Sequence, residues 1–122
     1  MTKYSIVFMA FAFVSIMSCG KDEETKADCA GVTPTYNNGV KAILDASCAT
    51  VGCHVGQFAA NNMDLKVYAI AKSVALSGKL LQSIKHESNA KAMPPDQGQG
   101  LVKLPESDIK KIECWIQNGA PE

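Results

Sequence analysis

The segment Cys48-Ala-Thr-Val-Gly-Cys53-His54 places two thiols and an imidazole within seven residues. Side chains of these types can form a disulfide, bind zinc, or attach a haem whose iron the histidine ligates. In the ordinary haem-attachment motif two residues separate the cysteines, and the histidine directly follows the second one. Here four residues separate Cys48 from Cys53, and His54 keeps the adjacent position.

Zinc is the least favoured of the three interpretations. A structural zinc ion takes four ligands, which usually come from paired motifs. Cys53 and His54 are adjacent and would be hard to bring onto one ion, while His86 stands apart from every cysteine. A Cys48–Cys53 disulfide with an incidental histidine is the simpler alternative to haem, and the motif alone does not exclude it.

Haem attachment needs two thiols that add to the porphyrin vinyl groups and an imidazole beneath the iron. Cysteines five positions apart cannot share a helix face, so the residues between Cys48 and Cys53 must bulge outward. Gly52 suits the unusual backbone angles that such a bulge requires. Because the porphyrin fixes the sulfur positions, the loop only has to span between them. The lengthened motif therefore remains compatible with haem.

Met93 is the favoured candidate for the sixth ligand of the iron. Low-spin electron-transfer haems often use a methionine sulfur as the sixth ligand, opposite the histidine. Met93 lies in a long loop rich in Pro, Gly and Gln, and Pro94-Pro95 stiffens the chain after it. Met63 is a weaker candidate. His86, at the end of a predicted helix, is most simply a surface or capping residue. The alternatives are that it is the sixth ligand, which would give a bis-histidine haem, or that it forms a hydrogen bond to a haem propionate.

The elements that must position these residues are helices. Apolar residues recur at helical spacing before Cys48 and near the C-terminus. Pro105 suits a first helical position, and Gly119 followed by Pro121 ends the last helix. We expect helices at 36–47, 67–76, 79–86 and 105–118, with loops at 55–66 and 88–102. The fold class is therefore all-α.

The apolar core of such a fold is thin. Of the four phenylalanines, only Phe58 lies beyond residue 18. A loop-rich chain of this size has little apolar surface to bury. A large apolar cofactor held covalently would supply the missing centre.

Residues 1–18 have the features of a secretory signal peptide. Lys3 precedes the apolar run IVFMAFAFV (6–14), which is too short to span a bilayer, since spanning takes ~20 residues. The closing Ile-Met-Ser-Cys (16–19) resembles the lipobox of bacterial lipoproteins, which implies that Cys19 is lipidated and begins the mature chain. Ordinary cleavage without a lipid is the alternative.

Residues 19–33 form a charged tether ahead of a domain at 34–122. The run Gly-Lys-Asp-Glu-Glu (20–24) resembles the signal by which some Gram-negative bacteria display lipoproteins on the outer face. A solvated linker would have the same composition. We expect an exported protein, lipid-anchored to the outer membrane and either periplasmic or surface-exposed.

The five cysteines can be assigned without a remainder. A lipid on Cys19 and two thioethers at Cys48 and Cys53 leave Cys29 and Cys114 as one disulfide. Two disulfides would also balance the count, so the count does not choose between them. Cys114 projects away from the apolar stripe of the last helix, and a bridge to the tether would suit that position.

Charge excludes one class of function. Twelve lysines balance twelve acidic residues, and the chain has no arginine, so the phosphate-binding features of nucleic-acid binders are missing. No acid–base or nucleophilic constellation suggests an enzyme. Four lysines could dock an acidic redox partner near the haem edge, although a solvated face explains them more simply. They are Lys72, Lys79, Lys85 and Lys91.

Together these motifs resemble a small bacterial class I cytochrome c domain of the exported, lipid-anchored kind. The resemblance covers about residues 34–122 and rests on the Cys48…Cys53-His54 motif, Met93-Pro94-Pro95 and the final helix with its WIQNGAP ending. It departs from that family in the two extra residues of the attachment motif.

The resemblance implies one covalent haem c, with thioethers at Cys48 and Cys53 and axial ligation by His54 and Met93. It also implies a terminal helix packed across the first one, and single-electron transfer to a redox partner protein of unknown identity. The main alternative is a helical envelope lipoprotein with two disulfides, a binding or structural role and no haem. A haem peroxidase is less favoured, because Met93 would close the iron to substrate.

Overall fold

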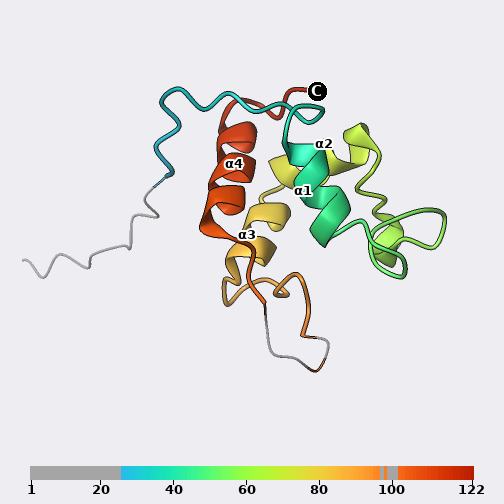
Figure 1. The fold of residues 1–122 in the computed structure, drawn as a ribbon. Helices are drawn as coiled ribbons and strands as arrows, with labels where there is room; N and C mark the ends of the chain where they lie inside the picture. The colour runs from blue at the N-terminus through green and yellow to red at the C-terminus, as the bar shows by residue number, and fades with distance from the viewer. Residues whose placement is uncertain (1–25, 97, 99–101) are drawn as a thin grey trace, which may run out of the picture.

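The computed structural model describes residues 26–96, 98 and 102–122. The expected signal segment, Cys19 and the first part of the tether lie outside the described residues. The described chain contains four α-helices and one short 3-10 turn, joined by loops (Figure 1). They are α1 (Val40–Ser47), the turn η1 (Ala60–Asn62), α2 (Tyr68–Leu76), α3 (Lys79–Lys85) and α4 (Glu106–Gln117). No strand occurs in this part of the chain, which confirms the all-α prediction.

The helices follow the periodic segments of the sequence closely. The largest difference is the start of α1, at Val40 rather than at residue 36. Gly39 has a φ of +111°, which lies outside the helical region, so the periodic residues before it form a turn. In the described ranges, no helix has the length and apolar character that crossing a bilayer requires.

α4 packs against both α1 and α3, and α2 packs against α3. The centre of the core is aromatic: the ring centroids of Tyr36 and Trp115 lie 6.2 Å apart, and Tyr68 lies 5.4 Å from Tyr36. Trp115 is fully buried, and its Nε1–H donates to the Pro121 carbonyl at 2.7 Å. Trp115 heads the large side chains that are fully buried. Because its polar atom is satisfied, its burial leaves no unpaired donor in the core.

The C-terminal residues close the core over α1 and α2. After α4 the chain turns through Gly119 and Ala120, both at positive φ. The Tyr36 N–H donates to the Pro121 carbonyl at 2.9 Å, and the Tyr68 hydroxyl donates to the Ala120 carbonyl at 2.9 Å. The last residues are thus part of the scaffold and hold α4 in register with the first helix.

The tether is fastened along the outside of α4. A disulfide joins Cys29 to Cys114, as expected from the direction of Cys114 on its helix. The Ala27 N–H donates to Glu113 Oε1 at 3.0 Å, and Gln117 Nε2 donates to the Ala27 carbonyl at 3.4 Å. Cys114 is fully buried because the tether covers it. Figure 1 shows this segment passing over one end of α4 before it enters α1.

The contribution of the disulfide to the free energy of unfolding can be measured. Cys29 and Cys114 are 85 residues apart in sequence, so the bridge restricts a long loop of the unfolded chain. Removing it with Cys29→Ala/Cys114→Ala should lower the free energy of unfolding by about 3–4 kcal/mol, chiefly because the unfolded chain gains conformational entropy. Urea unfolding measures the change. Asn118→Ala, which removes only an exposed 3.5 Å hydrogen bond to Val32, is the control and should change little. Equal unfolding midpoints for the double variant and the wild type would contradict this account.

Candidate functional site

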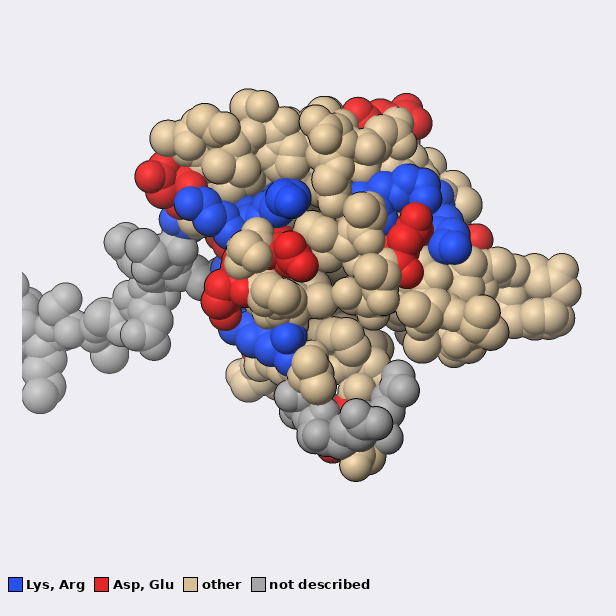
Figure 2. All heavy atoms as spheres, in the orientation of Figure 1, with Lys and Arg blue, Asp and Glu red and all other residues tan. Residues whose placement is uncertain are grey.

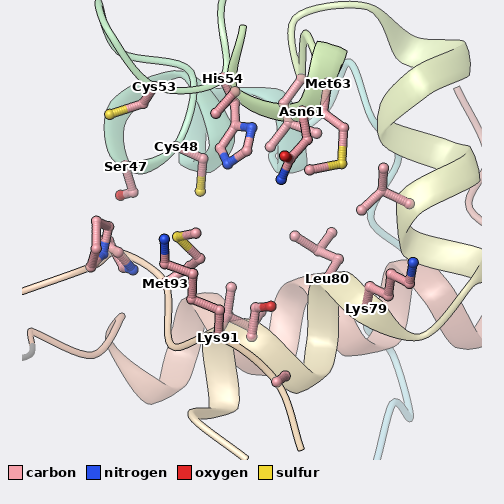
Figure 3. Close-up of a pocket in the computed structure, with 18 of the residues that line it drawn as sticks. Ser47, Cys48, Cys53, His54, Asn61, Met63, Lys79, Leu80, Lys91 and Met93 are labelled. Atoms are coloured by element: carbon pink, nitrogen blue, oxygen red, sulfur yellow. The ribbon is translucent and has the colours of Figure 1, made fainter.

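A cavity of about 510 Å³ lies between the loop that follows α1 and the wall made by α3 and the loop after it. Its volume is in the range of about 300–1,000 Å³ that small-molecule and cofactor pockets occupy. Figure 3 shows the two walls facing each other across open space, with Cys48 and His54 on one side and Met93 and Leu80 on the other. The residues that line the cavity include Cys48, Cys53, His54, Met63, Leu65, Val74, Leu80, Ile84 and Met93.

The first wall begins where α1 ends. The Cys48 N–H donates to the Leu44 carbonyl at 2.9 Å, so Cys48 caps the helix. The residues after it bulge outward, as expected: Val51 is 98% exposed and Gly52 has a φ of +83°. The His54 N–H then donates back to the Cys48 carbonyl at 3.1 Å. This bond closes the loop and holds the backbone of His54 beside Cys48 at the end of α1.

The His54 imidazole points into the cavity (Figure 3) and is only 8% exposed. Its Nδ1 is buried and has no hydrogen-bond partner. Leaving a buried polar atom unpaired costs about 1–3 kcal/mol, which makes such an atom uncommon in a folded protein. The backbone on either side is well fixed, since the Leu65 N–H donates to the His54 carbonyl at 3.0 Å. A buried imidazole held this firmly, with its ring facing a cavity, is suited to ligate a bound group.

The second wall carries Met93, in the loop after α3. The Met93 N–H donates to the Ser83 carbonyl at 3.0 Å, which ties this loop to α3. Met93 and His54 project from opposite walls in Figure 3. Met63, the weaker candidate, lies on the same side as His54 and is therefore poorly placed to bind opposite it. His86 is not among the residues that line the cavity.

The structure thus gathers Cys48, Cys53, His54 and Met93 around one cavity, although 45 positions separate the first from the last. Sequence reasoning did not single out the apolar residues of α3 that complete the wall, Leu80 and Ile84. Their four-residue spacing marks one helix face, but the sequence does not say whether that face meets the core or a cavity.

The four lysines considered as a docking patch differ in their contacts. Lys72 donates to the Tyr68 hydroxyl at 3.2 Å, and Lys85 pairs with the buried Glu113 at 3.1 Å. Only Lys79 and Lys91 line the cavity. Figure 2 shows lysines and acidic side chains mixed over this face, while the loop that projects at the right is uncharged. Residues 46–63 indeed contain no Lys, Asp or Glu.

Cys48 and Cys53 are both free thiols. Burial, together with the nearby Cys53, raises the pKa of the Cys48 thiol to about 11. Across the described ranges, no three His, Cys, Asp or Glu side chains come together as a cluster for a metal ion. A haem does not need such a cluster, because the porphyrin supplies the equatorial ligands of its iron.

No protein-family model, no curated protein and no solved structure matches the chain. The function must therefore be argued from the residues of the cavity.

The two thiols should differ in reactivity in protein prepared without haem. At pH 8 a pKa of about 11 leaves only about one Cys48 thiol in a thousand ionised, and the side chain is buried, so iodoacetamide should modify Cys53 first. Modification of Cys48 should become faster by about tenfold per pH unit while the pH stays below that pKa. Peptide mass spectrometry after timed labelling measures both rates, with Cys53→Ser as the control. Equal rates at the two cysteines would show that Cys48 is not shielded.

Proposed function

We propose that this chain is a mono-haem c-type cytochrome that carries single electrons in the cell envelope. One observation carries the proposal: the buried His54 imidazole, with an unpaired Nδ1, faces a cavity. Two free thiols lie on the same wall as this ring, and a methionine lies on the opposite wall. Thiols, imidazole and thioether are the set of side chains that attach and ligate haem c.

In this proposal Cys48 and Cys53 form the thioethers, His54 is the proximal ligand and Met93 is the distal ligand. When bound, the haem supplies one-electron chemistry at its iron. The chain itself would hold the porphyrin through Cys48 and Cys53 and would present His54 and Met93 to it from the two walls of the cavity. Leu80, on α3, is 5% exposed and belongs to the apolar part of the cavity wall.

The fold is compatible with the cytochrome c arrangement inferred from the sequence. The first and last helices are in contact, and the attachment segment directly follows the first helix, while the proposed distal ligand precedes the last one. These relations support a cytochrome c-like fold.

Export and lipid anchoring are part of the proposal. A disulfide fits an oxidising compartment outside the cytoplasm, and the Cys29–Cys114 bridge supports that location. The proposed lipidation at Cys19 would tether the domain to the outer membrane, facing the periplasm or the exterior. The electron-transfer partner would be another redox protein.

Covalent haem attachment is the direct test. Expressed with a signal peptide and a cytochrome c maturation system, the wild-type protein should be red and heavier by one haem. Cys48→Ala/Cys53→Ala should lose the covalent adduct while retaining the Cys29–Cys114 bridge. A colourless wild-type protein whose mass falls by four hydrogens would identify it instead as a haem-free lipoprotein with two disulfides.

The axial assignment makes a further prediction. Met93→Ala should convert the low-spin ferric haem to a high-spin or water-ligated form. It should also lower the reduction potential by on the order of 0.1 V, within the range of about 0.8 V that axial ligands span. Met63→Ala is the matched control and should leave the visible spectrum and the potential unchanged. The reverse pattern for the two methionines would overturn the assignment.

A further inference from the structure

The backbone of Met93 is held at both its donor and its acceptor. The Met93 N–H donates to the Ser83 carbonyl at 3.0 Å, and the Met93 carbonyl lies 3.2 Å from His86 Nε2. The same Ser83 carbonyl accepts the His86 N–H at 3.2 Å. Ser83, His86 and Met93 therefore form one small hydrogen-bonded unit that joins the end of α3 to the proposed ligand loop.

The direction of the side-chain bond follows from its chemistry. A carbonyl oxygen only accepts, so Nε2 of His86 must carry a proton and donate it to Met93. The neutral Nε2–H tautomer and the charged imidazolium both satisfy this requirement. The contact therefore does not depend on the charge of His86.

His86 also has an unusual backbone conformation for a residue with a side chain. His86 caps the C-terminus of α3 in the left-handed region, at φ 60° and ψ 41°. An L-residue with a Cβ is strained there, and glycine is the usual occupant of this position. Among the described residues of the ligand loop, the Met93 carbonyl is the partner of the His86 side chain.

We propose that His86 is a positioning residue: its Nε2–H holds the Met93 carbonyl so that the Met93 side chain stays opposite His54. This inference rests on the proposed function, since it concerns the sixth ligand of the proposed haem. It also replaces the alternative in which His86 is itself that ligand. The ring is not part of the cavity wall, and the nitrogen that would ligate iron is already bonded to Met93.

Two substitutions separate the hydrogen bond from the shape of the helix end. In His86→Gln the side-chain amide can donate from about the position of Nε2, whereas His86→Asn is too short to reach the Met93 carbonyl. Asparagine tolerates left-handed backbone angles better than most residues, so His86→Asn should not destabilise the end of α3. Both variants would be made in the full-length protein with haem attached.

The measured quantity is the affinity of the ferric protein for cyanide, which displaces the methionine sulfur from the iron. Binding is monitored by the loss of the methionine-to-iron charge-transfer band. Losing one hydrogen bond of ordinary strength should make His86→Asn bind cyanide about fivefold to tenfold more tightly than the wild type. His86→Gln should stay close to the wild type. Thermal melting of the three proteins shows whether the helix end is intact, and the reduction potential gives an independent second readout.

The outcomes are distinguishable. Unchanged cyanide affinity in His86→Asn, or an equal increase in both variants, would overturn the positioning role. If His86→Asn lost the low-spin spectrum while Met93→Ala kept it, His86 would be the ligand, and the inference would be wrong. If the wild type carried no covalent haem, the proposed function would fail before the role of His86 was reached.

Discussion

The fixed position of the His54 imidazole is the constraint on which the rest of this account depends. Its N–H donates to the Cys48 carbonyl and its carbonyl accepts the Leu65 N–H, so the backbone that carries the ring is held at both its donor and its acceptor. The cost of burying Nδ1 without a partner is therefore built into the fold. The proposed role as an iron ligand would give this buried ring a function.

The scaffold and the two walls of the cavity share one hydrophobic core, in which Tyr36 and Trp115 pack with cavity-lining residues such as Leu65 and Leu80. Trp115, Tyr36 and the C-terminal residues lock α4 to α1, and the Cys29–Cys114 bridge fastens the tether to the outer side of α4. α3 then packs on α4 and presents Leu80 to the cavity. Cys48 is thus positioned by α1 and Met93 by α3, two separate parts of one core.

Much of this arrangement could be predicted from the sequence, because helical periodicity and the spacing of Cys48, Cys53 and His54 are local signals. The start of α1 was missed because periodicity does not register the positive φ of Gly39. The pairing of Lys85 with Glu113 and the bond from His86 to Met93 depend on how helices and loops meet in space. No single stretch of sequence encodes these contacts.

The central claim is that the cavity holds an iron between His54 and Met93. X-ray absorption at the iron edge of the purified, oxidised protein tests it most directly, since it identifies the atoms bound to the metal. The account predicts a six-coordinate iron with five nitrogen neighbours and one sulfur neighbour, the sulfur being lost in Met93→Ala. Six nitrogen neighbours, or protein that contains no iron after expression with the maturation machinery, would contradict it.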